Sequence, residues 1–206
     1  MDENTVYGDY LDVLGYIKDD LEKRINAYSA EYARTTGEKL FEHFTARVKS
    51  EESMREKLER KGLELTPRSA LREVRDSIGI RIICSFVDDV YTNAEKIKAF
   101  DNIRVVEEKD YIRHAKPNGY RSYHLICEVE APFPDIDGRD PGRYFCEIQL
   151  RTIAMDSWAS LEHEMKYKKS VKDQELVVAE LKRVADELAS CDLSMQTIKN
   201  IIRERD

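Results

Sequence analysis

Residues 77–86, with the sequence SIGIRIICSF, form a nearly unbroken apolar run that contains a single arginine. A short apolar run that is rich in isoleucine and bounded by polar residues is typical of a β-strand buried inside a protein. Four further segments have the composition of strands, and they are residues 44–50, 102–108, 122–130 and 143–152. The chain is therefore expected to build a sheet.

Helical patterns separate these strands. Residues 50–62 form a helix that Ser50 can cap, and residues 87–100 and 153–169 also have helical patterns. The last two strands are joined by the turn-rich segment PFPDIDGRDPG at 132–142, which favours a hairpin. Strands that alternate with helices and end in a hairpin predict an α+β fold, in which helices cover a mixed sheet.

Both ends of the chain show helical periodicity. Apolar residues recur every three or four positions near the N-terminus, at Tyr7, Leu11, Leu14, Ile17, Leu21, Ile25 and Tyr28. Near the C-terminus the steps alternate strictly between four and three, as in a heptad seam, at Val177, Leu181, Val184, Leu188, Cys191, Met195, Ile198 and Ile202. The stripes can dock on the central domain or on each other, or they can form a surface for self-association.

The composition fits one compact domain. A chain of 206 residues with 41% hydrophobic residues can build one core and has little room for a second. No segment approaches the roughly 20 apolar residues of a membrane span, and the acidic N-terminus lacks the features of a signal peptide. We therefore expect a cytoplasmic protein without a membrane partner. The net charge of −7 argues against non-specific binding to nucleic acid.

Several common site signatures are missing from the chain. The four cysteines include no CxxC pair, so we expect them to be reduced and mostly buried, without a zinc ribbon or a thioredoxin-type site. The glycines form neither GxGxxG nor a Walker A loop, and no HExxH occurs. The dinucleotide-binding, P-loop and zinc-protease classes are therefore poor matches.

Two carboxylates lie in or beside apolar strands. Asp76 directly precedes the run at 77–86, and Glu147 lies inside the strand predicted at 143–152. Adjacent strands can bring two such acids together, where they can bind Mg²⁺ while substrate phosphates and water supply the other ligands. Ordinary solvent-exposed charge at a strand end is the alternative interpretation of either residue.

The segment DYIRHAKPNGYRSYHL, at residues 110–125, combines basic residues with a turn. Lys116, Arg121 and His124 supply charge for a phosphate around the turn PNG, which can expose Tyr120. An exposed aromatic ring can stack on a purine base and contribute about 1–3 kcal/mol. A basic surface loop without a ligand is the alternative interpretation.

Basic residues also accompany two of the strands. Arg47 and Lys49 alternate along the first predicted strand, so they share one face while Ser50 points to the other. This pair suits a polyphosphate or the face of an adenine. Arg81 lies between two isoleucines of a buried strand, where a guanidinium requires a partner such as Asp76, a phosphate or a stacked base.

Four fragments carry a resemblance to a known family. RVKS, DSIGIRIIC, KPNGYRSYH and EIQLRT, the last followed by MDSWASLEHEMKYK, occur in the order and approximate spacing of the synthetase domain of RelA/SpoT-type proteins. From about residue 40 to residue 168, the chain resembles a small alarmone synthetase. Each fragment is modest evidence by itself, whereas the combination is highly specific.

The resemblance implies a fold, a reaction and an assembly. The implied fold is nucleotidyltransferase-like, with a mixed, mostly antiparallel five-stranded sheet flanked by helices. The implied reaction is the Mg²⁺-dependent transfer of the β,γ-pyrophosphate of ATP to the 3′-hydroxyl of GDP or GTP, with release of AMP, in the stringent response. One synthetase domain is expected over residues 1–206, with an N-terminal helix at 1–35, a catalytic core at 40–168 and a C-terminal helical segment at 172–206 that supports a homotetramer.

The same resemblance implies roles for single residues. Asp76 is expected to bind magnesium, and Glu147 to bind metal or accept the proton of the guanosine 3′-hydroxyl. Arg47 and Arg81 are expected to sandwich the adenine of ATP, and Tyr120 to stack on the acceptor guanine. The expected triphosphate contacts are Lys49, Ser50, Ser53 and Lys57. The other expected acceptor-binding residues are Lys116, Asn118, Arg121, His124, Gln149 and Arg151.

The chain departs from the family pattern at two positions that concern packing. Ser77 occupies a position that is commonly apolar, and Tyr123 replaces a leucine that is frequent in the long members. None of the four histidines precedes an aspartate, so we expect no hydrolase built on a histidine-aspartate motif.

Two other functions stay open at this point. A toxin-like relative that pyrophosphorylates the 3′ end of tRNA is disfavoured by the net acidity. A non-catalytic regulator that binds nucleotides or RNA is disfavoured by the presence of both Asp76 and Glu147. The sequence does not rank GDP, GTP and GMP as acceptors, and it leaves a regulatory RNA as the one nucleic-acid partner worth considering.

Overall fold

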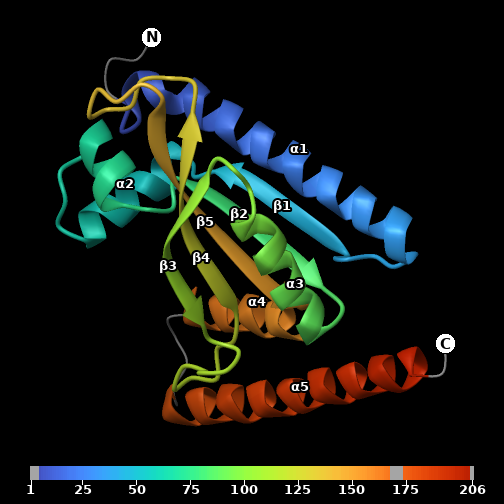
Figure 1. Cartoon of the computed structure of the whole chain (residues 1–206). Helices are drawn as coiled ribbons and strands as arrows, with labels where there is room; N and C mark the ends of the chain where they lie inside the picture. The colour runs from blue at the N-terminus through green and yellow to red at the C-terminus, as the bar shows by residue number, and fades with distance from the viewer. Residues whose placement is uncertain (1–4, 168–173, 205–206) are drawn as a thin grey trace.

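Five strands form one sheet in the order β1-β2-β5-β4-β3 (Figure 1). The computed structural model describes residues 5–167 and 174–204. Strands β2 and β5 are parallel, and the other neighbouring pairs are antiparallel. This arrangement confirms the predicted α+β fold with a mixed, mostly antiparallel sheet. The strands are β1 (His43–Val48), β2 (Ile78–Cys84), β3 (Ile103–Asp110), β4 (Tyr123–Ala131) and β5 (Gly142–Thr152).

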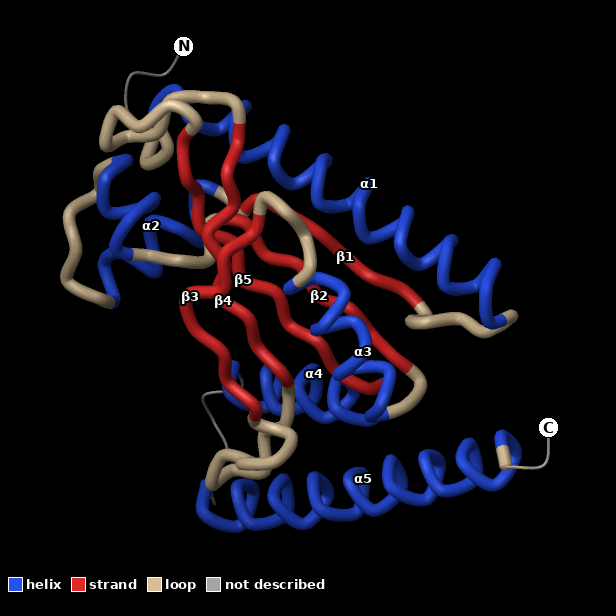
Figure 2. Tube along the Cα trace, in the orientation of Figure 1, coloured by secondary structure: helices blue, strands red, loops and turns tan. Residues whose placement is uncertain are grey.

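Helices flank this sheet, as Figure 2 shows. They are α1 (Leu11–Thr36), α2 (Glu51–Arg60), α3 (Val87–Lys98), α4 (Ile153–Tyr167) and α5 (Gln174–Arg203). A 3₁₀ turn at Gly8–Tyr10 precedes α1, and a π-helical turn at Ser69–Glu73 precedes β2; neither was predicted. The predicted ends of the fourth helix at residue 169 and of the C-terminal segment at 172 and 206 lie outside the described residues.

The N-terminal stripe docks on the sheet. Helix α1 runs along β1 (Figure 1), and the side chains of Leu14, Ile17, Leu21 and Ile25 are buried in the core. Leu11 is the exception in the predicted stripe, because its side chain is 49% exposed at the first turn of the helix. Of the interpretations that the periodicity left open, docking on the central domain therefore holds for this helix.

The C-terminal stripe behaves differently along its length. The first half of the seam is half-buried over α4, whereas its second half is exposed, at Cys191, Met195, Ile198 and Ile202. In this second half the residues buried against the body are polar, and they are Asp192, Gln196 and Lys199. An apolar face that is exposed while polar residues pack inward leaves the outer side of α5 available for another surface.

Hydrogen bonds and an ion pair hold the second half of α5 in place. The Thr152 hydroxyl donates to Oδ2 of Asp192 at 2.7 Å, and Nζ of Lys199 lies 2.5 Å from Oδ1 of Asp89. Both contacts are buried, so each polar group is compensated where water is excluded. The heptad pattern alone did not indicate this polar docking.

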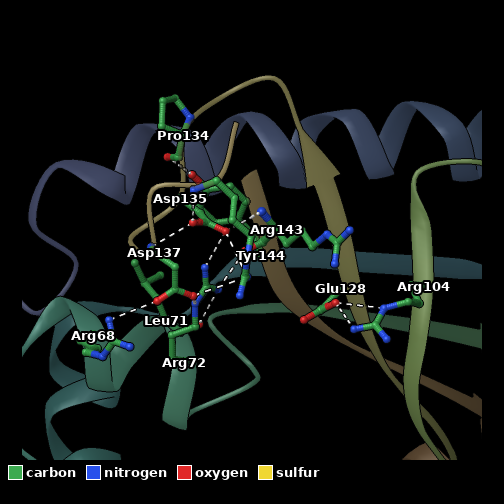
Figure 3. A network of polar contacts seen from close by, with 11 residues as sticks. Arg68, Leu71, Arg72, Arg104, Glu128, Pro134, Asp135, Asp137, Arg143 and Tyr144 are labelled. Carbon is green, nitrogen blue, oxygen red and sulfur yellow. Dashed lines mark hydrogen bonds and ion pairs between the residues drawn. The ribbon is translucent and has the colours of Figure 1, made fainter. Parts of the chain in front are cut away.

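The hairpin between β4 and β5 is organised by one buried carboxylate (Figure 3). Asp135 accepts hydrogen bonds from the backbone N–H groups of Asp137, Arg139 and Arg143, at 2.9 to 3.1 Å, and pairs with Nη2 of Arg72 at 2.8 Å. Burial raises the pKa of Asp135, but the backbone hydrogen bonds outweigh it and hold the pKa below its ordinary value. The loop is therefore tied to the π-helical turn that carries Arg72.

The two departures from the family pattern are absorbed by local packing. The buried Ser77 hydroxyl donates to the carbonyl oxygen of Ala70 at 2.6 Å, which anchors the strand β2 to the π-helical turn. The Tyr123 hydroxyl donates to Glu108, and Nζ of Lys98 lies 5.5 Å from the centre of its ring. Tyr123 and His124 point to opposite faces of β4, so Tyr123 lies on the face away from Glu147.

The cysteines and the helices can be compared with what the composition predicted. All four cysteines are free; Cys191 is exposed and the other three are buried, as expected for most of them. Within residues 5–167 and 174–204, no helix is both long and apolar enough to cross a bilayer.

Candidate active site

A cavity of about 500 Å³ lies on the face of the sheet shared by β1, β2 and β5. Side chains two residues apart in a strand share a face, and the register pairs Thr45 with Arg81 and Gly79 with Glu147. The parallel pairing of β2 with β5 therefore sets polar side chains from distant segments side by side. The lining residues are Thr45, Arg47, Lys49, Asp76, Gly79, Ile80, Arg81, Glu147 and Gln149.

Asp76 lies at the entrance of β2 between two lysines. Nζ of Lys49 and Nζ of Lys57 each lie 2.5 Å from its Oδ2. Burial alone raises the pKa of Asp76, but the hydrogen bonds from both lysines outweigh burial and lower the pKa below its ordinary value. The buried Oδ1 has no hydrogen-bond partner among the described residues. Asp76 is thus an ionised carboxylate with one oxygen free for a ligand.

Glu147 belongs to a closed ring of hydrogen bonds. Its Oε1 lies 3.1 Å from Nδ1 of His124, and its Oε2 accepts from Nε2 of Gln149 at 3.2 Å. Nε2 of His124 lies 2.8 Å from the Tyr120 hydroxyl, which accepts from Nη2 of Arg151 at 2.7 Å. The same Nη2 donates to Oε1 of Gln149 at 3.0 Å, which closes the ring.

The ring indicates how His124 meets Glu147. An ionised carboxylate can only accept, so Nδ1 of His124 carries a proton and donates it to Glu147. Arg151 can only donate, so the Tyr120 hydroxyl, which lies 2.8 Å from Nε2 of His124, accepts from Arg151. Burial raises the pKa of Glu147, but the hydrogen bond from His124 opposes burial, and the net pKa is below its ordinary value. Glu147 is therefore an ionised, oriented acceptor of protons.

Arg81 has a partner that the sequence did not predict. Its Nη1 lies 3.5 Å from Oδ1 of Asp156 on α4, whereas Asp76, one of the partners considered for it, pairs with lysines. The same Oδ1 of Asp156 lies 2.9 Å from Nη1 of Arg151. The buried Nε of Arg81 has no hydrogen-bond partner among the described residues, so this guanidinium keeps a donor for a ligand.

The sequence of this chain is similar to those of known proteins, and the similarity indicates its family. The profile of a family described as "Region found in RelA / SpoT proteins" matches residues 46–172. The GTP pyrophosphokinase YwaC of Bacillus subtilis (strain 168) is 40% identical over 202 residues, which cover 96% of this chain and 94% of that protein. This chain belongs to the RelA/SpoT family.

Solved structures agree with this RelA/SpoT membership. Small alarmone synthetase 2 from Bacillus subtilis has a TM-score of 0.79 and 38% identity, with 93% of this chain and 97% of that chain covered. Small alarmone synthetase 1 from the same species, solved with its product pppGpp, has a TM-score of 0.78 and 32% identity, with 92% and 94% covered. The chain is accordingly a small alarmone synthetase.

In this RelA/SpoT member, helix α2 and its N-cap carry three of the four residues that were predicted to contact a triphosphate. Ser50 is the N-cap of α2, and its hydroxyl accepts from the backbone N–H of Ser53 at 3.3 Å. Lys57 reaches Asp76 from the last turn of the helix. Ser50 and Ser53 are exposed and are not among the residues that line the cavity, although Ser50 directly follows Lys49, which does line it.

The predicted acceptor loop lies next to the ring of hydrogen bonds. Nζ of Lys116 lies 4.8 Å from the centre of the Tyr120 ring, and the Asn118 amide donates to Glu162 of α4 at 3.1 Å. Arg121 points elsewhere, because its guanidinium donates to the carbonyl oxygen of Ala185 on α5 at 3.2 Å. The structure therefore groups Tyr120 and Lys116 beside the ring of hydrogen bonds, outside the residues that line the cavity, and engages Arg121 in holding the loop on α5.

Two residues of the site escaped sequence reasoning. Thr45 lines the cavity two positions before Arg47, so alternation along β1 was the signal that pointed to it. Asp156 lies in the first turn of α4, directly after the strand that carries Glu147. The position of Asp156, four residues after the end of β5, was a weaker signal. The direction of its side chain depends on where α4 begins, which the sequence alone did not fix.

Proposed function

We propose that this small alarmone synthetase is a GTP pyrophosphokinase, which transfers the β,γ-pyrophosphate of ATP to the 3′-hydroxyl of GDP or GTP and releases AMP. The observation that carries the proposal is the meeting of Asp76 and Glu147 in one cavity, although 70 positions separate them in the chain. Around these acids lie the basic residues that a triphosphate requires. The product is ppGpp or pppGpp, and the role is the stringent response.

The donor is assigned to the β1 and β2 side of the cavity. Small alarmone synthetase 1 from Bacillus subtilis has been solved bound to AMPCPP, an analogue of ATP, and it is 29% identical to this chain with a TM-score of 0.71. Arg47 and Arg81 of this chain then sandwich the adenine. Lys49 and Lys57 bind the triphosphate beside Asp76, with Ser50 and Ser53 at the start of α2.

The acceptor is assigned to the side of the ring of hydrogen bonds. The related structure with pppGpp supports a guanine nucleotide as a ligand of this chain. Tyr120 stacks on guanine, and Lys116 and Arg151 supply positive charge for the nucleotide. Gln149 and His124 orient Glu147 toward the ribose. Asn118 and Arg121 hold the loop that carries Tyr120, through Glu162 and α5.

The residues of the cavity fit a magnesium ion. Asp76 offers a buried carboxylate oxygen without a partner, and Glu147 offers a second carboxylate in the same cavity. Within residues 5–167 and 174–204, no group of three or more histidine, cysteine or acidic side chains is arranged so that it could hold a metal ion by itself. Two carboxylates suit Mg²⁺, which takes its other ligands from water and substrate phosphates. When bound, the ion neutralises charge on the β- and γ-phosphates.

The reaction needs the 3′-oxygen in line with the β-phosphorus of ATP. Glu147 accepts the proton of the 3′-hydroxyl, and its hydrogen bonds to His124 and Gln149 hold it in position. Lys49 and Lys57 offset the negative charge that develops on the transferred group. Holding both nucleotides in one cavity replaces an encounter in solution with an oriented contact.

The assembly and the setting are also proposed. The exposed apolar half of α5 supports a homotetramer that is formed through the terminal helices, with residues 172–206 as the oligomerisation segment and 40–168 as the catalytic core of one synthetase domain over 1–206. We place the protein in the cytoplasm, as an enzyme without a hydrolase site. GMP is a third candidate acceptor, and a regulatory RNA is the one nucleic-acid partner that we retain.

One assay tests the proposal and separates it from the alternatives. The purified chain is incubated with ATP and Mg²⁺ and with labelled GDP, GTP, GMP or tRNA, and the products are resolved by chromatography. We expect AMP together with ppGpp or pppGpp. A modified product from labelled tRNA alone would identify a tRNA pyrophosphokinase, and no consumption of ATP with any acceptor would leave a non-catalytic regulator.

A further inference from the structure

One carboxylate oxygen joins two arginines from neighbouring strands. Oδ1 of Asp156 lies 2.9 Å from Nη1 of Arg151 on β5 and 3.5 Å from Nη1 of Arg81 on β2. The side chain of Arg151 is 6% exposed and that of Arg81 is 43% exposed. The two contacts therefore differ, because Arg151 is fixed in the interior while Arg81 faces the cavity.

The positive charges around Arg81 require a nearby negative charge. Burial lowers the pKa of Arg81, the positive charges of Arg151 and Arg47 lower it further, and the charge of Asp156 opposes them. The charges of Arg151 and Arg47 thus act on Arg81, and the Asp156 carboxylate, which contacts Arg81 and Arg151, offsets part of this repulsion. Asp156 is the residue that the described structure places in this position.

The two arginines belong to different substrates in the proposed function. Arg81 lines the cavity assigned to ATP, and its Nε awaits a partner. Arg151 donates to the hydroxyl of Tyr120, and its guanidinium carbon lies 5.4 Å from the centre of that ring, which is assigned to the acceptor guanine. The carboxylate therefore connects the donor side with the acceptor side.

We propose that Asp156 is a positioning residue that couples the two nucleotide sites, so that binding of ATP strengthens binding of the guanine nucleotide. The inference rests on the proposed function. The contact of Arg81 with Asp156 is an ion pair without a hydrogen bond, whereas Arg151 donates a hydrogen bond to the same oxygen. When a donor nucleotide engages Arg81, the carboxylate is left to Arg151, which is held more firmly against Tyr120.

Equilibrium binding measures this coupling directly. Titration calorimetry gives the Kd of GDP with and without AMPCPP, in the presence of Mg²⁺, and the ratio of the two Kd values is the coupling factor. We expect a factor of about five or more for the natural chain, at the lower end of typical couplings between sites. Asp156→Asn removes the charge but keeps the shape, and we expect a factor near one.

Matched variants separate positioning from a general loss of acidity or fold. Glu164→Gln makes the same chemical change at an exposed position of α4, and it should keep the natural coupling factor and thermal unfolding. Asp156→Glu keeps the charge and should retain a factor above one. Asp156 is 23% exposed in the first turn of α4, so both changes at this position should leave the fold intact.

Three results would overturn the inference. The first is that Asp156→Asn keeps the coupling factor of the natural chain. The second is that Asp156→Asn and Asp156→Glu lower the coupling factor equally. The third is a factor of one in a natural chain that transfers pyrophosphate from ATP to GDP, which would leave the proposed function intact. A natural chain that transfers nothing would instead remove the proposed function and the inference with it.

Discussion

The phenol oxygen of Tyr120 lies 2.8 Å from Nε2 of His124, and this contact joins the loop assigned to the acceptor with the candidate base. His124 in turn orients Glu147, because its Nδ1 lies 3.1 Å from Oε1 of Glu147. The ring and the hydroxyl of Tyr120 therefore have separate tasks, which mutation can distinguish.

Two substitutions of Tyr120 should affect different kinetic constants. Tyr120→Phe keeps the ring but removes the hydroxyl that contacts Nε2 of His124, so we expect kcat to fall about tenfold, the worth of one hydrogen bond of ~1.4 kcal/mol. Its KM for GDP should change little. Tyr120→Ala removes the stacking surface and should raise KM for GDP far more than KM for ATP. Steady-state kinetics with both substrates varied measures this, and equal weakening of both would contradict guanine stacking.

Removal of the base should slow the transfer strongly without abolishing ATP binding. Glu147→Gln keeps the shape of the side chain, but an amide cannot accept the proton of the 3′-hydroxyl. We expect kcat to fall by about 10²–10⁴-fold, the usual contribution of a general base, while calorimetry with AMPCPP shows largely unchanged affinity. Glu130→Gln, at an exposed position of β4, is the matched control and should keep full turnover. Full turnover by Glu147→Gln would exclude both proposed roles.

The Mg²⁺ concentration that the reaction requires should depend on Asp76. We expect chelation to stop the reaction and Asp76→Asn to raise the Mg²⁺ concentration needed for half-maximal rate by at least tenfold, since a neutral oxygen is a poorer ligand. Asp101→Asn, at an exposed position outside the cavity, should respond to Mg²⁺ as the natural chain does. An unchanged Mg²⁺ requirement in Asp76→Asn would place the metal elsewhere.

The hairpin loop should tolerate no side chain at Gly142. A Cβ there would lie 2.3 Å from the backbone oxygen of Phe133, a contact that requires the backbone to shift. We expect Gly142→Ala to lower the free energy of unfolding by about 1–3 kcal/mol, as overpacking does. Gly15→Ala, in open space on α1, should instead raise it by up to about 1 kcal/mol because alanine favours a helix. Urea denaturation gives both values, and equal effects would contradict the steric argument.

The docking of α5 should depend on pH through Asp192. Burial raises the pKa of Asp192, while the hydrogen bond from Thr152 and the charge of Arg121 oppose burial. The folded chain therefore holds this proton more tightly than the unfolded chain does. Its contribution to stability is present below the unfolded pKa of about 4 and is lost as the pH rises through the folded pKa.

Asp192→Asn should remove this penalty. The amide keeps an acceptor for the Thr152 hydroxyl without a buried charge, so we expect a higher free energy of unfolding at pH 7 and a flatter profile above pH 4. Asp186→Asn is the control on the same helix, because Lys182 lowers the pKa of the exposed Asp186. Urea denaturation across the pH range measures both variants. Destabilisation by Asp192→Asn at pH 7 would contradict the assigned sign.

The sequence determined the elements of the fold and most members of the site. The run SIGIRIICSF is the buried strand β2, and the helical stripe of the N-terminus is the docked face of α1. The motifs singled out Asp76 and Glu147, whose roles stay predictions. These successes have one reason: periodicity and local composition report which side of an element is apolar, and that information lies within each segment.

Only the tertiary structure decided which neighbour each face meets. Arg81 pairs with Asp156 because α4 begins directly after β5, and no pattern along the chain states that geometry. The second half of the α5 seam is exposed because Asp192 and Lys199 find buried partners on other elements, so polar contacts override the apolar stripe. Partners that are distant in sequence are chosen by packing, and packing is a property of the assembled chain.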